Sequence, residues 1–598
     1  MDYNYQGFWT NWSHGPVLGL TVTTTKVYGN LIIASMTIFV AFVANRLWNI
    51  ICIALHRGYS TTERRDTLHH QRQVILRNAS SPGSGLSAFF CLLLAWRGTT
   101  IRRHLRLWPM ILLASACLLG FMLSGSIFSA ISIVSGNDVL RNCLGSENST
   151  KMETYSYEYL PDETGDLPEL VHDASVYAHC CYNNTDSPCY MSCAGFFARR
   201  LPTNETVNRA ECPFQGQICS SANANLRLDT GYIDSNDHIG LNAPANERLA
   251  WRYVLHCAPL KTKNYTSHSL LGNDSVPIAE LDRVDGDIII VFLSGNGVLF
   301  REALDDDWYQ ATVPVSLDDS KDGNESTFRY RPLNAASPMG CVQQMQWCNS
   351  AYPRDRGCGP LAGTYDAFLG AAPLFNLTSD EVDAANSSRP FSSKASGARL
   401  IWPALAILGS PASSLDLVIA NLGSRSLISQ LLITNGVQWP IPINQWQDDV
   451  KHWWETALAS VQATFAKMTM TSFSVPLTNE EVKMCQSQKE RSTTYTSFSV
   501  FGLSLITLFG VVTIIISYSL EPFFQWLSKR RKSMQYTHLE WVTNGALQLH
   551  RLAHDEELSQ SSWARCDEEI PINNAETLLL SLDISDPGHP MLAQRVIK

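Results

Sequence analysis

Three long apolar runs constrain this 598-residue chain more than any other feature of its sequence. A helix needs about 20 apolar residues to cross the hydrocarbon core of a bilayer. The runs at 109–135 and 498–520 contain no charged residue and meet this length, and the run at 30–55 meets it if Asn45 and Arg46 lie near its end. We therefore predict a membrane protein with three transmembrane α-helices, at 30–55, 109–135 and 498–520.

The run at 30–55 does not have the features of a cleaved signal peptide, because it is too long and follows no positively charged segment. We interpret it as an uncleaved anchor. Arg46 is expected to reach the cytosolic interface rather than to form a polar site within the membrane. A shorter apolar stretch at 86–96 is too short to span a bilayer and is expected to lie along the interface.

The placement of arginine predicts the orientation of the chain. The segment 56–108 holds nine arginines, and the basic cluster 529–532 follows the third run directly. The positive-inside rule assigns the loop 56–108 and the tail 521–598 to the cytosol. The N-terminal tail 1–29 and the ectodomain 136–497 are then extracellular or luminal. We expect a multi-pass protein of the plasma membrane or of a secretory-pathway endomembrane, with the lipid bilayer as its first partner.

Glycosylation sequons test this orientation independently. Eight N-x-S/T sites fall in the segment 136–497, one lies in the N-terminal tail, and only Asn78 lies in the predicted cytosolic loop. Sequons on the extracellular side are candidates for N-glycans. The predicted glycosylation sites are Asn11, Asn148, Asn183, Asn204, Asn264, Asn273, Asn324, Asn376 and Asn386.

Cysteine use agrees with an oxidising compartment. Four of the 16 cysteines, Cys52, Cys91, Cys117 and Cys566, lie in or near the apolar runs or in the tail. The other twelve lie in the predicted ectodomain, and an even number is typical of a disulfide framework. The disulfide candidates are Cys143, Cys180, Cys181, Cys189, Cys193, Cys212, Cys219, Cys257, Cys341, Cys348, Cys358 and Cys485.

The densest cysteine cluster is "HCCYNNTDSPCYMSC" at 179–193. A zinc site would need four ligands in tetrahedral geometry, usually from closely spaced pairs of Cys or His. A redox site usually shows C-x-x-C. Neither pattern is present. The sequon at Asn183 within the cluster indicates an exposed loop. We therefore interpret these cysteines as covalent staples and expect Cys180 and Cys181 to have different partners. Cys143 and Cys485, near the two ends of the ectodomain, are a candidate pair, but the connectivity stays open.

The pattern of the ectodomain predicts an α+β domain. Residues 286–300 indicate two strands around a Gly-Asn-Gly turn, and 310–317 indicate another strand. Residues 446–468 predict a helix, because Val450, Trp454, Ala457, Val461 and Phe465 recur on one face. A second helix is expected over 415–433. The segment carries more acidic than basic residues, which argues against a nucleic-acid partner.

Two further helical surfaces need a partner. Ala116, Gly120 and Ser124 form a small-residue ladder, which is typical of close helix packing in lipid, against a helix of this chain or of a second copy in a homo-oligomer. In the tail, Leu539, Val542, Ala546, Leu549 and Leu552 predict an amphipathic helix over 535–558. This helix is expected to dock on the membrane surface, on the loop 56–108 or on a cytosolic protein.

Catalytic signatures are missing from the sequence. We find no H-E-x-x-H, G-x-S-x-G, P-loop or G-x-G-x-x-G pattern. His550 and His554 are four residues apart, but without a third ligand a solvated face is the simpler interpretation. We therefore predict no catalytic residue, no metal and no cofactor, and we lean towards a non-enzymatic protein.

The carboxyl third resembles a large, poorly characterised family of filamentous-fungal three-span membrane glycoproteins. The resemblance is carried by "WPIPINQWQDDVKHWW" (439–454), "TSFSVFGLSLI" (496–506) and "LEWVTNGALQLHRLAHDEELSQSSWARCDEEIP" (539–571), while Gly545 and His550 depart from the helix usual in the last block. It implies a fungal integral membrane protein with a glycosylated exterior, and it supplies no activity or site residue.

The leading functional hypothesis is a non-enzymatic membrane glycoprotein whose ectodomain binds a ligand or partner and whose cytosolic tail recruits a protein. One alternative is an accessory protein or enzyme of a fungal secondary-metabolite pathway, because some relatives are encoded beside such clusters. Another is an oligomeric ligand-gated channel, because two spans bracket a cysteine-rich ectodomain.

Overall fold

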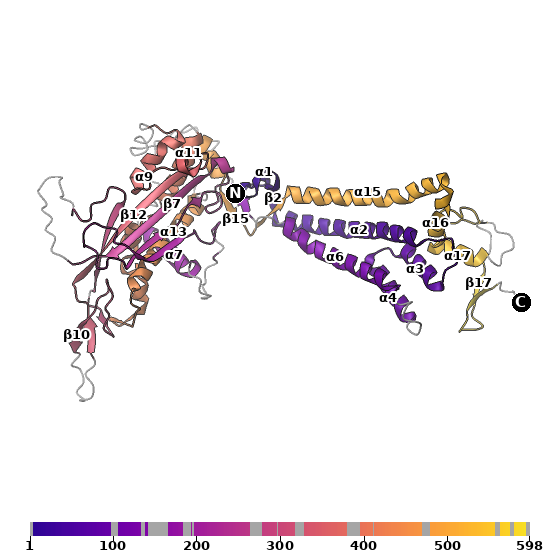
Figure 1. Ribbon diagram of the computed structural model, residues 1–598, viewed down its shortest axis with the longest axis horizontal. Helices are drawn as coiled ribbons and strands as arrows, with labels where there is room; N and C mark the ends of the chain where they lie inside the picture. Colours follow the sequence, from indigo (N-terminus) through magenta and orange to yellow (C-terminus); the bar gives the residue numbers. More distant parts are fainter. Residues whose placement is uncertain are drawn as a thin grey trace, which may run out of the picture. The chain divides into compact units, whose positions relative to one another are not determined.

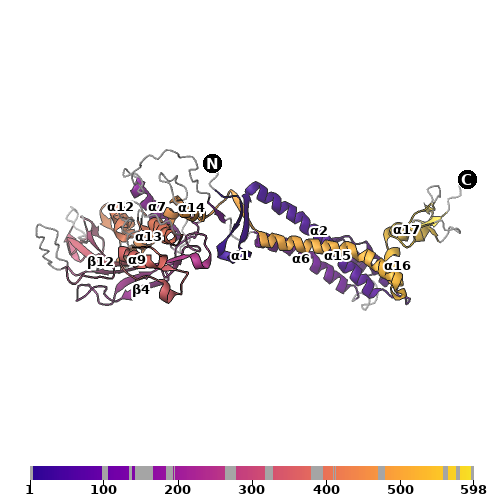
Figure 2. The same cartoon turned by 90° about the horizontal axis from the view of Figure 1, so that it is seen from above.

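The computed structural model describes most of the chain: residues 4–96, 106–132, 138–141, 166–182, 193, 196–262, 278–295, 297–316, 328–378, 395–408, 410, 412–468, 479–555, 563–573 and 579–593. The chain divides into two compact units (Figures 1 and 2), which are described separately. Unit 1 consists of residues 1–24 and 135–497, and unit 2 consists of residues 25–134 and 498–598.

Unit 1 is built on a six-stranded antiparallel sheet in the order β4-β5-β7-β12-β8, with β6 paired to β7. The two long central strands pair from Leu249↔Asn349 to Pro259↔Met339, and directly opposite residues share a face of the sheet. Cys257 and Cys341 are opposite each other in this register and form a disulfide. The strands are β4 (Glu205–Ala210), β5 (Asn225–Asp229), β6 (Ile233–Asp234), β7 (Leu249–Pro259), β8 (Asp287–Ser294) and β12 (Ala336–Asn349).

One face of this sheet is covered by helices, with α13 (Gln445–Met468) at their centre. The helix predicted over 446–468 is confirmed, and the side chains of its predicted apolar face are all 3% exposed or less. Trp454 stacks on Tyr253 of β7, with ring centroids 4.5 Å apart. Figure 1 shows α13 and α7 beside β7 and β12. The helices in contact with α13 are α7 (Asp166–Cys181), α11 (Ala395–Leu408) and α12 (Leu415–Leu422).

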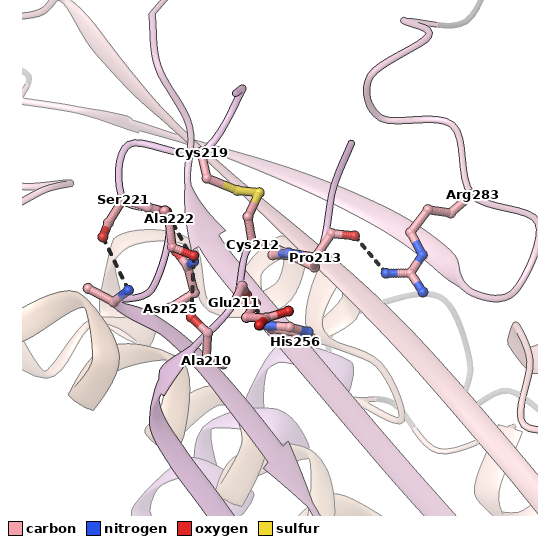
Figure 3. Close-up of a disulfide and its surroundings, with 11 residues drawn as sticks. Ala210, Glu211, Cys212, Pro213, Cys219, Ser221, Ala222, Asn225, His256 and Arg283 are labelled. Carbon is pink, nitrogen blue, oxygen red and sulfur yellow. Dashed lines mark hydrogen bonds between the residues drawn. A yellow bond between two sulfur atoms is a disulfide. The ribbon is translucent and has the colours of Figure 1, made fainter. Parts of the chain in front are cut away.

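The opposite face of β7 and β12 is covered by a loop that the Cys212–Cys219 disulfide closes (Figure 3). Phe214 of this loop packs so closely on Gly340 that a Cβ there would lie 2.6 Å from the ring. The Arg283 guanidinium donates to the Pro213 carbonyl at 2.6 Å and ties the loop to the next segment. Unit 1 is therefore a disulfide-rich domain of mixed helices and sheets.

Two local structures expected in unit 1 differ in outcome. Residues 286–300 form two strands, as predicted; β8 joins the edge of the large sheet and β9 (Leu299–Phe300) joins a second one. The helix expected over 415–433 ends at Leu422, because Gly423 takes a φ of 55° that favours glycine, and 3-10 turns follow. The second sheet contains β10 (Val313–Ser316), β11 (Phe328–Arg331), β9, β14 (Val437–Gln438) and β13 (Ile433–Thr434).

The N-terminal residues belong to the fold of unit 1. β1 (Gly7–Thr10) and β2 (Leu20–Thr25) form a three-stranded sheet with β16 (Tyr495–Ser499), and β3 (Asp138–Leu140) pairs with β15 (Lys489–Arg491). The fully buried Lys489 joins these parts, because its Nζ donates to Asn11 Oδ1, Ser13 Oγ and Asn236 Oδ1 at 2.8–3.2 Å.

Unit 2 is helical, and two of its described helices, α2 (Lys26–Tyr59) and α15 (Val500–Arg530), are long and apolar enough to cross a bilayer. These two helices run in the same direction, as Figures 1 and 2 show. Phe39 meets Gly510, the Arg46 guanidinium lies over Tyr518, and the Arg57 guanidinium lies over Phe524. The third predicted span lies in α6 (Trp108–Ser132), whose described side chains end at Met122, so it stays a prediction.

The small-residue ladder of α6 does not pack on a described part of this chain. Ala116 and Gly120 are exposed, and a Cβ at Gly120 would meet nothing within 4 Å. The side chain of Ser124 lies outside the described residues. The close approach between helices is instead at Gly510 of α15, where a Cβ would lie 2.4 Å from the Phe39 ring. Packing of the ladder on a second copy stays a prediction.

The tail helix predicted over 535–558 is two helices, α16 (Lys532–Thr543) and α17 (Ala546–Asp555), separated at Asn544 and Gly545. The predicted apolar face is also wrong for α17, because its buried residues are the polar Gln548, Arg551 and His554.

The remaining described elements complete the two units. In unit 2 they are α3 (Thr67–Asn78), α4 (Pro82–Ala95), β17 (Ser581–Asp583) and β18 (Met591–Ala593). In unit 1 they are η1 (Trp12–His14), α1 (Gly15–Leu18), η2 (Ala245–Glu247), α8 (Arg354–Gly357), α9 (Thr364–Ala371), η3 (Ala372–Phe375), η4 (Gly423–Ser426), η5 (Ile428–Leu432) and α14 (Asn479–Gln486).

Candidate functional site at the tail helices

The tail of unit 2 docks on the end of α2 and on α3. Trp541 of α16 packs edge-on against His56, with ring centroids 4.9 Å apart. Asn78, the last residue of α3, donates to the Asn544 carbonyl at 2.8 Å and accepts from the Ala546 amide at 3.1 Å. One side chain therefore holds both sides of the break between α16 and α17. Of the docking surfaces considered for the tail, the structure shows the loop 56–108.

Arg77 is the centre of this contact. Its side chain is 12% exposed, and its guanidinium lies 4.7 Å from the centre of the Trp541 ring. It forms ion pairs with Glu521 at 3.3 Å and with Glu569 at 2.8 Å. The Trp541 Nε1–H also donates to Glu521 at 3.0 Å. Arg77 thus connects α3, α15, α16 and the segment 563–573, and we call these contacts the Arg77 clamp.

Two cavities adjoin the Arg77 clamp, and Arg77, Glu521, Trp541 and Glu569 line both of them. The first, which we call the tail cavity, has a volume of about 430 Å³ and is also lined by Arg57, Phe524, His538 and Asp567. The second, which we call the Arg46 cavity, has a volume of about 480 Å³ and is also lined by Arg46, Asn49, Ser517 and Tyr518.

The two cavities differ in charge. Four carboxylates line the tail cavity, those of Glu521, Asp567, Glu568 and Glu569. Burial lowers the pKa of His538, and the nearby Arg57 lowers it further, so this imidazole is neutral at pH 7. The tail cavity therefore has an excess of negative charge. The Arg46 cavity is lined by two arginines and two carboxylates, so its formal charges balance, although both carboxylates form their ion pairs with Arg77 and neither pairs with Arg46.

Histidine side chains in both units make further polar contacts. Among the described residues, no three His, Cys, Asp or Glu side chains are grouped to hold a metal ion. His550 and His554 contact each other through Nε2 at 3.1 Å. In unit 1, Ser175 Oγ lies 2.8 Å from His452 Nε2, but both are buried and the His452 Nδ1 has no partner among the described residues to orient it.

The predicted cysteine pattern can be followed in both units. Cys181–Cys193, Cys212–Cys219, Cys257–Cys341 and Cys348–Cys358 are disulfides, and Cys180 and Cys485 are disulfide-bonded too. Cys180 and Cys181 therefore have different partners. Cys143 and Cys189 lie outside the described residues. Cys52, Cys91, Cys117 and Cys566, all in unit 2, are free.

The predicted glycosylation sites separate into three groups. Asn204 and Asn376 are exposed on unit 1 and can carry a glycan there. The prediction of a glycan on Asn11 is wrong. Its side chain is fully buried and its Oδ1 accepts a hydrogen bond from Lys489, so the folded unit leaves no room for a glycan. The others, Asn148, Asn183, Asn264, Asn273, Asn324 and Asn386, lie outside the described residues.

No family model, curated protein or solved structure matches this chain. The Arg77 clamp was not singled out from the sequence, because Arg77 is separated from Glu521 by 444 residues and from Glu569 by 492. One signal pointed towards it: the arginine-rich loop 56–108 has an opposite charge to the acidic "DEE" at 567–569.

Proposed function

We propose that this chain is a multi-pass membrane glycoprotein that acts by binding, with unit 1 on the extracellular or luminal side and the tail in the cytosol. The division of the cysteines supports this proposal: all described cysteines of unit 1 are disulfide-bonded, whereas those of unit 2 are free. The parallel α2 and α15 fit two crossings in the same direction. Exposed Phe523 and Trp526, followed by the basic cluster 529–532, are typical of a membrane interface.

The orientation can be tested with the thiols and the glycans of the full chain. We expect a membrane-impermeant maleimide to label Cys566 in intact cells only after permeabilisation. Glycans removable by endoglycosidase are expected on Asn204 and Asn376. Labelling of Cys566 from outside, or unmodified asparagines at both positions, would overturn the proposed orientation.

Within this plan, the tail is the part that recruits a cytosolic protein, and the Arg77 clamp sets how much of the tail is available. The clamp is the observation that carries this role, because one guanidinium holds α15, α16 and the acidic segment together. A partner that competes for Glu569 would release the segment 563–573. Ectodomain binding would use unit 1, whose rigid, stapled core suits a displayed recognition domain.

The clamp can be tested with Arg77→Met in the full chain. We expect faster hydrogen–deuterium exchange in Lys532–Asp555 and in 563–573, because two ion pairs and a cation–π contact are lost. The matched control is Arg65→Met, since Arg65 pairs with Glu63 on an exposed surface, with 50% of its side chain accessible. Unchanged exchange in the Arg77 variant would show that the clamp does not hold the tail.

A further inference from the structure

Arg46 is a charged residue of unit 2 that lies between two aromatic rings. Its guanidinium lies between the Phe42 ring, 4.8 Å from the ring centre, and the Tyr518 ring, at 4.3 Å. No hydrogen bond or ion pair joins it to any residue that the structure describes. A guanidinium carries five N–H donors and does not lose its charge. The two rings therefore fix its position and leave its donors unused.

These donors belong to a cavity that offers further polar groups. Asn49 and Ser517, from the same two helices as Arg46 and Tyr518, line the Arg46 cavity with Asn78 and Ser80. The carboxylates of Glu521 and Glu569 also line this cavity and form ion pairs with Arg77. Arg46 is therefore a charged group of this lining that forms no ion pair with a described residue, and amide and hydroxyl groups lie in the same lining.

The Arg46 cavity also has a defined place along the helices. Tyr518 lies two residues before the end of the uncharged run 498–520, and exposed Phe523 and Trp526 come shortly after it. Aromatic residues at the end of an apolar run are typical of the headgroup level of a bilayer. Under the proposed function, Arg46 therefore lies at the depth of the lipid phosphates on the cytosolic side.

We propose that the Arg46 cavity binds a phosphate group, held by the Arg46 guanidinium and by the Asn49 amide. A planar guanidinium binds phosphate through two parallel hydrogen bonds, and the stacked rings orient it for this contact. The phosphate can belong to a lipid headgroup or to a soluble phosphorylated molecule. Only the lipid source rests on the proposed function, because the recognition chemistry is the same for both.

The test uses the full chain purified in detergent and a titration with dioctanoyl phosphatidic acid, followed by the thermal unfolding temperature. We expect the phosphatidic acid to raise this temperature, whereas dioctanoylglycerol, which lacks the phosphate, leaves it unchanged. Arg46→Gln is expected to weaken binding by about tenfold or more. Arg530→Gln is the matched control, since Arg530 also lies over an aromatic ring, that of Trp526 at 4.4 Å, but lines neither cavity.

Inorganic phosphate distinguishes the two sources. An equal rise with inorganic phosphate assigns the site to soluble ligands, and a rise with the phosphatidic acid alone assigns it to lipid. Binding by Arg46→Gln as tight as wild type, or no binding by the wild-type chain to either compound, overturns the proposal. If Arg46→Gln does not fold, Asn49→Leu removes the amide and narrows the cavity, and unchanged binding by that variant overturns it as well.

This result is independent of the orientation of the chain. The titration is made in detergent and needs no membrane, whereas the proposed orientation is tested by labelling Cys566 in cells. Absence of phosphate binding therefore leaves the orientation untouched, and external labelling of Cys566 leaves phosphate binding untouched.

Discussion

At the scale of single residues, unit 1 buries charged groups in its core and gives them hydrogen-bond partners there. Asp449 on α13 is fully buried, and its carboxylate accepts from the Tyr309 hydroxyl and the Ile428 amide, both at 2.7 Å. Burial raises its pKa to about 6. The sequence predicted the helix that contains Asp449, but it did not predict that this carboxylate anchors η5 to α13.

We expect Asp449→Ala to lower the free energy of unfolding of unit 1 by about 3 kcal/mol, because it leaves a buried hydroxyl and buried amides without an acceptor. The matched control is Asp448→Ala: Asp448 is half exposed and pairs with Lys451 at 3.2 Å, so its loss costs about 1 kcal/mol or less. Urea unfolding followed by tryptophan fluorescence measures both. Equal effects of the two substitutions would contradict a special role for Asp449.

His452 predicts a dependence of stability on pH. Burial lowers its pKa from 6.5 to about 4, with a smaller contribution from His179, so the folded chain keeps it neutral while the unfolded chain takes up a proton. Its contribution is complete above pH 6.5 and is lost as the pH falls towards 4. At about 1.4 kcal/mol for each tenfold change in proton affinity, the loss reaches about 3 kcal/mol.

The stability of the wild-type chain relative to His452→Gln is therefore expected to fall between pH 7.5 and pH 4.5. The buried Asp449 and Glu455 have raised pKa values and act in the opposite direction, but they are present in both proteins and cancel in the comparison. The exposed His14→Gln serves as the control variant. A wild-type advantage that is the same at both pH values would contradict this interpretation.

At the scale of elements, the sequence predicted best where one periodic face meets one core. α13 was predicted within one residue at its start, because five of its apolar residues recur at helical spacing and all are buried. The tail was predicted less well. Its apolar spacing continues through Gly545, but the helix breaks there and α17 buries Gln548 and Arg551 instead, with Gln548 donating to the Arg565 and Glu568 carbonyls of the segment 563–573. That burial depends on residues that follow the helix in the chain, so the apolar periodicity of the helix itself does not predict it.

The packing of α2 on α15 gives an element-scale prediction. Gly510→Leu is expected to lower the stability of the full chain in detergent by about 1–3 kcal/mol, because its side chain would overlap the Phe39 ring and Val43. The control is Gly120→Leu in α6, where a new Cβ meets nothing within 4 Å. Thermal unfolding of both variants measures the difference. A destabilisation by Gly120→Leu as large as by Gly510→Leu would contradict the assigned contact.

At the scale of the whole molecule, the Arg77 clamp is a site that composition and residue spacing cannot predict. Its members come from α3, α15, α16 and the segment 563–573, and Arg77 and Glu569 are almost 500 residues apart in the chain. Apolar runs and cysteine counts are properties of one segment, so they were predictable. A site assembled by the docking of one terminal segment on another is a property of the folded chain, and only the charge opposition of its two parts was visible in the sequence.

The arrangement of cysteines in two units gives the last prediction. The Cys257–Cys341 disulfide joins the central strands of unit 1 and closes a loop with a sequence separation of 84. Its removal in a Cys257→Ala, Cys341→Ala double variant is expected to cost about 2–4 kcal/mol, mainly by freeing the unfolded chain. Because this loop lies entirely within unit 1, hydrogen–deuterium exchange should rise in β7 and β12 and stay unchanged in α2 and α15. A matched rise in the two helices would show that the units unfold together, and the separate treatment of their stabilities would then fail.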